Sequence, residues 1–184
     1  MVAVYKYRNE IRIWEHTIHL KHTGVYTIQN YRKRVKNMIK TTYFWKATHE
    51  PDTSETYVSI SRQKMHGAET MGEYPDLMPS WDIIQKAHEL GYNEESFLAY
   101  RDAYFAQLDK LDAHKVYNDL QNCVLVCFES SNDLYTGKKF CHRRMVAGWL
   151  EEKLGIEVPE ETRTGHYVKV PAIYRNTTYS ELQA

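Results

Sequence analysis

Four residues of types that catalyse reactions or bind anions lie in one stretch of the chain. Glu129 follows the apolar run Cys123–Phe128, and Cys141, His142 and Arg143 stand side by side after a polar loop. Glutamate and histidine can exchange protons with a substrate, and a cysteine beside cations at a helix start has a lowered pKa. We predict Cys141 as a nucleophile, with His142 as its base and Glu129 orienting the histidine. The alternative is that Cys141 packs as a small apolar side chain.

The same stretch could bind an anion. A helix N-terminus offers free N–H groups, Arg143 adds a bidentate donor, and Arg62 stands at the end of an earlier predicted strand. A phosphate or carboxylate site is therefore expected, and the alternative is a buried structural pair between a glutamate and Arg143. The remaining predicted ligand-binding residues are two tyrosines that could stack or donate, Tyr100 and Tyr104, and Ser80.

The cysteines suggest two further kinds of site. Cys123, Cys127, Cys141 and His142 resemble a Cys₃His zinc set, but an extended run would hold Cys123 and Cys127 about 13 Å apart at ~3.3 Å per residue. We therefore expect no metal and no other cofactor. A redox pair of Cys127 and Cys141 would need Cα atoms within about 7 Å of each other, and we rank it last.

Periodicity predicts the elements that position these residues. The β-branched or alternating segments 24–28 and 56–61, and the buried run Cys123–Phe128, are expected to be strands. Helices are expected at 31–40, from Trp81 to Gly91 with Ser80 as N-cap, from 93 or 94 to 111, and from 141 to 155. Residues 63–80 and 129–140 are expected to be loops, and Tyr167–Ile173 another strand. A buried strand, a long loop and a helix start form the unit that places ligands in α/β folds.

Composition excludes several classes of protein. The chain has 184 residues, of which 42% are apolar and 26% charged, so a fibrous or disordered chain is not expected. We find no apolar run of the length a transmembrane helix needs, and no signal-peptide core at the N-terminus. Three cysteines form no paired framework, which fits a reducing compartment, so we predict a cytoplasmic protein that does not bind membranes.

Charge is unevenly distributed although the whole chain is neutral. Residues 1–49 hold ten Lys and Arg against two Asp and Glu, and residues 50–119 hold six against fourteen. The first third is also rich in tyrosine, tryptophan and histidine, which suits stacking on bases beside neutralised phosphates. Its predicted nucleic-acid-binding residues are Arg32, Lys33, Arg34 and Lys36. The alternative is that these cations pair with the acidic middle of the chain or face water.

Four motifs in order give a resemblance to a known family. They are Leu77-Met78-Pro79-Ser80, Phe97-x-x-Tyr100-x-x-x-Tyr104, Val124-Leu125-Val126-Cys127-Phe128-Glu129 and Phe140-Cys141-His142-Arg143. Together they resemble the domain-of-unknown-function family 488, which is widespread in bacteria and phages. The resemblance implies a compact, Rossmann-like, three-layer α/β domain with a mainly parallel sheet. It also implies that Glu129, Cys141, His142 and Arg143 line a common pocket.

These observations give a prediction for the whole chain. We expect one α/β domain over residues 1–184, with residues 1–50 as a divergent, basic and aromatic part and residues 57–161 as the core that resembles the family. The protein is expected to bind or process a nucleotide, a nucleoside or a nucleic-acid base. As an enzyme it would be an acid–base hydrolase or transferase. The alternative is a non-catalytic module that binds nucleic acid or protein through its basic third. The sequence is compatible with a homo-oligomer.

Overall fold

The computed structural model describes residues 38–136, 138–161 and 170–183, together with four short strands nearer the N-terminus. The chain divides into two compact units, Met1–Met38 and Ile39–Ala184. In the first unit, β1 (Tyr5–Tyr7) pairs antiparallel with β2 (Glu10–Arg12), and β3 (Thr17–Leu20) pairs antiparallel with β4 (Gly24–Thr27). The strand predicted at 24–28 is therefore confirmed as β4. The helix predicted at 31–40 lies mostly outside the described residues.

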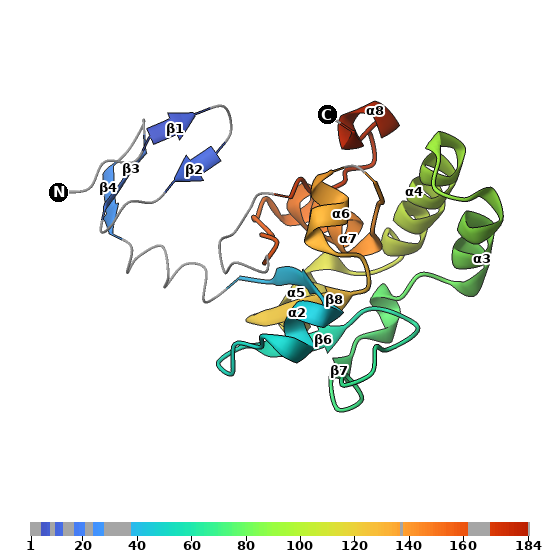
Figure 1. Cartoon of the computed structure of the whole chain (residues 1–184), viewed down its shortest axis with the longest axis horizontal. Coiled ribbons are helices and arrows are strands. Elements are labelled where there is room, and N and C mark those ends of the chain that lie inside the picture. Colours follow the sequence, from blue (N-terminus) through green and yellow to red (C-terminus); the bar gives the residue numbers. More distant parts are fainter. Residues whose placement is uncertain are drawn as a thin grey trace. The chain divides into compact units, whose positions relative to one another are not determined.

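The second unit is built on a four-stranded, all-parallel sheet, which confirms the α/β prediction (Figure 1). The strand order is β5-β8-β6-β7, with β5 at Lys40–Tyr43, β6 at Thr56–Ser59, β7 at Gly72–Glu73 and β8 at Cys123–Cys127. The central strand β8 has a continuous apolar sequence because both of its faces are buried. A short segment after α7 (His142–Leu154) adds to the outer side of β5 through an isolated bridge between Thr41 and Glu160.

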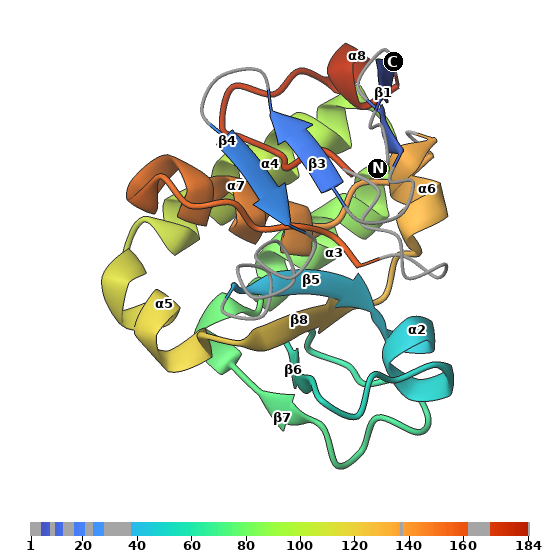
Figure 2. The ribbon, with the colours of Figure 1, turned by 90° about the vertical axis from the view of Figure 1, so that its left-hand side faces the viewer.

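Helices cover both faces of this sheet. Helix α7 (His142–Leu154) packs on β5 and β8, and α4 (Glu94–Leu108) and α5 (Ala113–Leu120) pack against α7 (Figure 2). Val58, Ile60 and Leu125 point into this side of the core. On the other face, Val126 packs with α2 (Phe44–His49) and with Ala68.

The remaining elements complete the unit. The short helix η1 (Pro75–Leu77) precedes α3 (Trp81–Leu90), which packs on α4. α6 (Ser131–Tyr135) lies in the connection between β8 and α7, and α8 (Tyr179–Leu182) follows near the C-terminus and packs on α4. No helix within the described ranges is long and apolar enough to cross a bilayer.

The strongly periodic helices follow the sequence pattern closely. The predicted stripe on α4 is confirmed, since Phe97, Tyr100, Tyr104 and Leu108 are buried. α4 begins after Asn93, whose side chain accepts a hydrogen bond from the Ser96 N–H. Ser80 precedes α3 as predicted, but its hydroxyl makes no capping hydrogen bond.

Two predicted segments differ from the structure, which also has a strand and a helix between residues 40 and 49. Lys40–Tyr43 is an edge strand, Phe44–His49 is a helix, and the unit that contains them begins at Ile39. The expected loop 63–80 contains β7 and η1. The described part of the strand predicted at Tyr167–Ile173 is irregular.

Candidate functional site

The candidate site is a pocket of about 470 Å³ beside the carboxyl ends of β6 and β8. These neighbouring strands send the chain to opposite faces of the sheet. After β8 the chain leads to α7, whereas after β6 it leads to Met65, Ala68 and Met71, which pack on the α2 face. Such divergence opens a crevice where α/β proteins bind ligands. The pocket therefore lies where the topology predicts a site.

Aromatic rings form much of the pocket lining. Tyr92 and Phe140 have ring centroids 5.5 Å apart, and Tyr100 lies 5.5 Å from the same Phe140 ring. Trp81, at the start of α3, also lines the pocket and is 55% exposed. Burial raises the pKa of Tyr92 to about 12, and the nearby negative charge of Glu129 adds to the shift. The phenol is thus a hydrogen-bond donor across the neutral pH range.

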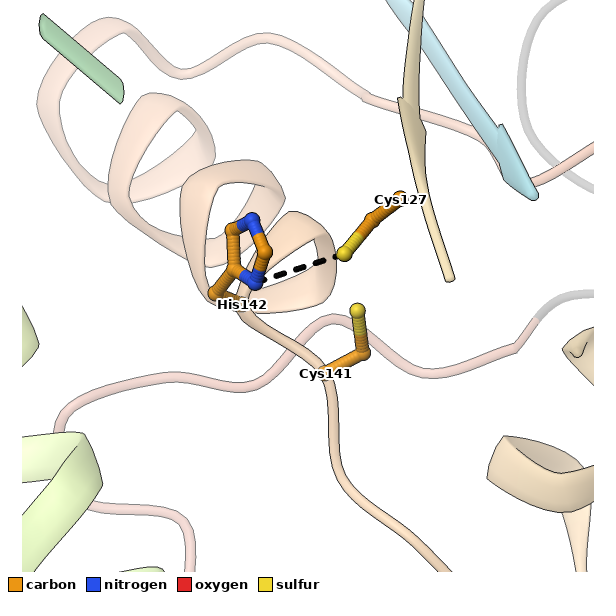
Figure 3. A group of neighbouring side chains, drawn as sticks. All are labelled: Cys127, Cys141 and His142. Atoms are coloured by element: carbon orange, nitrogen blue, oxygen red, sulfur yellow. Dashed lines mark hydrogen bonds between the residues drawn. The ribbon is translucent and has the colours of Figure 1, made fainter. Parts of the chain in front are cut away.

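Two cysteines and a histidine meet in the lining where β8 ends and α7 begins (Figure 3). Cys127 is the last residue of β8, Cys141 is the N-cap of α7, and His142 is its first residue. Sγ of Cys127 lies 3.4 Å from Nδ1 of His142. The other ring nitrogen, Nε2, lies 2.8 Å from the carbonyl oxygen of Ile60. Since a carbonyl only accepts, Nε2 carries a proton and Nδ1 faces the sulfur.

Glu129 adds a carboxylate to this group. Its Oε2 lies 3.6 Å from Sγ of Cys127, two residues back along the chain. Burial raises the pKa of Glu129 to about 7, and the negative charge of Cys141 acts in the same direction. A carboxyl with such a pKa can both give and take a proton at neutral pH.

The surroundings of Cys127 and Cys141 shift the pKa values of the two thiols in opposite directions. Burial opposes ionisation of Cys141, but the hydrogen bond with Cys127 and the charges of Arg143 and His142 together lower its pKa well below the ordinary value. Burial and the neighbouring Cys141 raise the pKa of Cys127. Burial lowers the pKa of His142, yet its interactions with Cys141 and Glu129 outweigh burial and raise it. Cys141 is thus the thiol that ionises first.

Arg143 does not line the pocket, which corrects its predicted role as a direct ligand of an anion. Its guanidinium is fully buried and donates to both carboxylate oxygens of Glu160, with a closest N–O distance of 2.7 Å. A third nitrogen, Nη1, lies 3.3 Å from Sγ of Cys141. The buried Glu–Arg alternative is therefore the observed arrangement, with Glu160 as the glutamate. Arg143 positions and polarises Cys141 from behind.

The other predicted site residues divide between the pocket and the core. Arg62 and Tyr100 line the pocket, and Nε of Arg62 donates to the carbonyl of Pro79 at 2.8 Å. Tyr104 is buried instead: its hydroxyl donates to Leu77, and its ring packs edge-on against His142 with centroids 5.7 Å apart. Ser80 is also outside the lining, where its N–H donates to Gln107 at 2.9 Å.

Sequence reasoning missed several functional neighbours. Tyr92, Phe140 and Trp81 are lining residues that no catalytic motif marks, although Phe140 belongs to one of the four family-like motifs. Glu160 lies 17 residues after Arg143, in an irregular segment with no periodic pattern. Only the convergence of β5, α6 and α7 around Glu160 reveals its role.

The basic N-terminal cations are only partly described. Arg32, Lys33, Arg34 and Lys36 lie outside the described residues. Lys40 forms a salt bridge with Glu55, so for this cation the pairing with the acidic middle of the chain is confirmed.

Comparisons with known proteins found no relative of this chain. No protein-family model matches the chain, and neither the curated proteins nor the solved structures contain a significant match to it.

Proposed function

We propose that the pocket binds a nucleoside-, nucleotide- or nucleobase-like molecule and that Glu129 carries out acid–base chemistry on it. One observation carries the proposal: a carboxylate, two thiols and an imidazole gather in one part of a pocket whose lining also includes five Phe, Tyr and Trp side chains. A volume of about 470 Å³ is in the range that holds small ligands. The resemblance to family 488 implies a shared pocket for Glu129, Cys141, His142 and Arg143, and the first three of these line the pocket described above.

The polar and aromatic lining residues have complementary tasks in this proposal. Tyr100 and Phe140 offer ring faces and edges on which a base can pack. The bond to Pro79 fixes the guanidinium of Arg62 at the pocket, and its remaining N–H groups can donate to a phosphate. Glu129 lies with the thiols and the imidazole and would exchange the proton.

The test is a thermal-shift panel of nucleotides, nucleosides, bases and sugar phosphates, followed by chromatography of the incubated mixtures. We expect stabilisation that grows with ligand concentration. Arg62→Ala should weaken nucleotide binding about 10-fold or more, because a hydrogen bond to a charged group is worth about 1.5–3 kcal/mol, and it should leave nucleoside binding unchanged. Glu129→Gln should retain binding and reduce product formation by at least about 100-fold.

Exposed residues supply the matched controls. Lys86→Ala removes a cation from α3, and Glu157→Gln makes the same change as Glu129→Gln outside the pocket. Neither should affect binding or turnover. The proposal fails if no compound stabilises the wild-type protein, or if the control variants lose as much as Arg62→Ala and Glu129→Gln.

The charge of residues 1–49 favours a second candidate function. Ten Lys and Arg against two Asp and Glu, interleaved with aromatic residues, would suit a module that binds nucleic acid through phosphate contacts. That function would not involve the pocket.

A further inference from the structure

Three soft or borderline metal-ligand atoms converge in the pocket lining. One donor atom from each of Cys127, Cys141 and His142 lies within 4.8 Å of the other two, and all three residues are buried. We propose that Cys127, Cys141 and His142 bind a zinc ion whose fourth coordination position faces the pocket. The inference deepens the proposed function by supplying a Lewis acid beside Glu129, and it rests on that function for its catalytic meaning only.

The distances suit a tetrahedral ion. Zn–S bonds of about 2.3 Å and Zn–N bonds of about 2.0–2.1 Å place neighbouring ligand atoms about 3.6–3.8 Å apart. The observed separation of Cys127 Sγ from His142 Nδ1 is 3.4 Å. All three donor atoms lie within 4.8 Å of one another, so shifts of about 1 Å or less would bring them to the separations of a tetrahedral zinc site.

The histidine already has the orientation of a metal ligand. Metal-bound histidines donate their other ring N–H to a carbonyl or carboxylate, which fixes the tautomer. Nε2 of His142 is 2.8 Å from the carbonyl oxygen of Ile60, so the lone pair of Nδ1 points toward the two sulfurs. The edge-on ring of Tyr104 holds the imidazole from the side.

Charge balance also favours a dication. Two thiolates and a neutral imidazole carry two negative charges, which a divalent ion would neutralise. The carboxylate of Glu160 pairs with the guanidinium of Arg143, at a closest N–O distance of 2.7 Å, and lies 4.0 Å from that of Arg144. Nη1 of Arg143 donates a hydrogen bond to the sulfur of Cys141 and would hold that ligand in place from outside the coordination sphere.

The chemistry of the donors indicates which ion binds and what it would do. Two sulfurs and one imidazole select zinc over magnesium or calcium, which prefer oxygen. Three protein ligands with an open position are typical of catalytic zinc, whereas structural zinc has four. The same Cys₂His set, with a separate glutamate that is not a ligand, activates water in zinc-dependent nucleobase deaminases. Here the separate glutamate would be Glu129.

Cys123 is excluded from the set and serves as the matched control. It lies at the other end of β8, where its Sγ is 3.8 Å from the carbonyl oxygen of Gln121. The expectation that Cys123 and Cys127 cannot share an ion therefore agrees with the structure. The convergence of Cys127 with Cys141 and His142 depends on α7 reaching the end of β8, which the strand spacing does not reveal.

The test is a titration of the full-length, reduced, metal-free protein with Co²⁺, followed by competition with Zn²⁺. We expect one equivalent of Co²⁺, with the visible absorption of a tetrahedral site and a sulfur-to-cobalt charge-transfer band, and displacement by Zn²⁺. Cys123→Ser should bind with unchanged affinity. Cys127→Ser and Cys141→Ser should bind at least about 100-fold more weakly, with far-UV circular dichroism confirming that each variant is folded.

The outcomes separate this inference from the proposed function. Absence of a stoichiometric, thiolate-ligated cobalt spectrum in the wild-type protein overturns the zinc site, whatever the variants do. Equal loss of affinity in Cys123→Ser overturns it as well. Ligand stabilisation of the metal-free protein without metal binding would leave the proposed function intact and remove the zinc site. Metal binding with no compound that stabilises the protein would support the zinc site and overturn the proposed function.

Discussion

Glu160 joins three elements of the chain, β5, α6 and α7, through a single buried carboxylate. It accepts hydrogen bonds from Thr41 on β5 at 2.5 Å, from Ser131 on α6 at 2.6 Å, and from Arg143 on α7. Burial opposes its ionisation, but the charge and hydrogen bonds of Arg143 outweigh burial and hold its pKa below the ordinary value. The carboxylate therefore fixes the helix start on which Cys141 and His142 stand.

Glu160→Gln should be strongly destabilising, because it leaves the guanidinium of Arg143 buried without a counter-charge. We expect a loss of about 3–5 kcal/mol in the free energy of unfolding at pH 7, measured by urea denaturation. Asp119→Asn removes an acid from the exposed pair with Lys115 and should cost less than about 1 kcal/mol. Equal losses in the two variants would show that the buried pair does not hold the site.

The same pair sets a pH dependence. A carboxyl whose folded pKa is depressed contributes stability above its unfolded pKa and loses it as pH falls through the folded value. The difference in the free energy of unfolding between wild type and Glu160→Gln should therefore reach its full size above about pH 5. It should become smaller in more acidic buffer. A difference that widens on acidification would contradict the depressed pKa.

At the scale of elements, the backbone of α7 lies in direct contact with the backbone of Ile173 and Tyr174. The N–H of Ile173 donates to the carbonyl of Arg144 at 2.9 Å. A Cβ added at Gly148 would lie 2.1 Å from the carbonyl oxygen of Ile173 and 3.3 Å from Cα of Tyr174. Only glycine permits this approach of backbone to backbone.

Gly148→Ala should destabilise the protein although alanine is the better helix former. Helix propensity alone would favour alanine by about 1 kcal/mol, but the clash with a backbone carbonyl forces α7 and the Ile173 segment apart, at a cost of roughly 1–3 kcal/mol or more. Ala106→Gly, at an exposed position of α4, is the control and should lose about 1 kcal/mol. A gain of stability in Gly148→Ala, measured by thermal unfolding, would contradict the close approach.

The sequence predicts an element well where its apolar residues follow a regular pattern, either along one face or along both faces. The stripe of α4 and the continuous apolar run of β8 identified those elements because burial alone dictates their residues. The edge strand β5 was missed because Lys40-Thr41-Thr42-Tyr43 reads as polar. These side chains are buried through specific partners, Lys40 with Glu55 and Thr41 with Glu160, and no local pattern reveals such partners.

At the scale of the whole molecule, the sequence predicts which residues gather near the site, but it does not predict what each of them does there. Of the four residues expected in a common pocket, Glu129, Cys141 and His142 line it and Arg143 does not. The role of Arg143 could not be foreseen, because it depends on Glu160, a residue of a different segment. Long-range partners of this kind follow from the sheet order and from the packing of α7.

The uneven charge of the chain gives a prediction for the intact protein. If residues 1–49 bind nucleic acid, affinity should fall steeply with salt, and reversal of Arg32, Lys33 and Arg34 to glutamate should weaken binding. The slope of log affinity against log salt should become shallower by about three, one for each lost phosphate contact. Fluorescence anisotropy with short DNA and RNA measures both effects.

A charge-matched variant makes the comparison specific. Reversal of the exposed residues Lys86, Lys110 and Lys138 changes the net charge by the same amount outside the basic third. It should leave the salt slope nearly unchanged. Binding that is unaffected by the N-terminal reversal, or equally weakened by both, would exclude a nucleic-acid site at Arg32–Arg34.

The position of β8 between β5 and β6 also sets the order in which the chain can acquire its structure. During synthesis, neither β5 nor β6 has its central main-chain partner until β8 has been made. β8 follows β5 by about 80 residues, a delay of roughly 4–16 s at about 5–20 residues per second. β6 can pair with β7 before then, whereas β5 can join the sheet only after β8 has been made, so the edge of β5 is the part of this sheet that must wait longest for its partner.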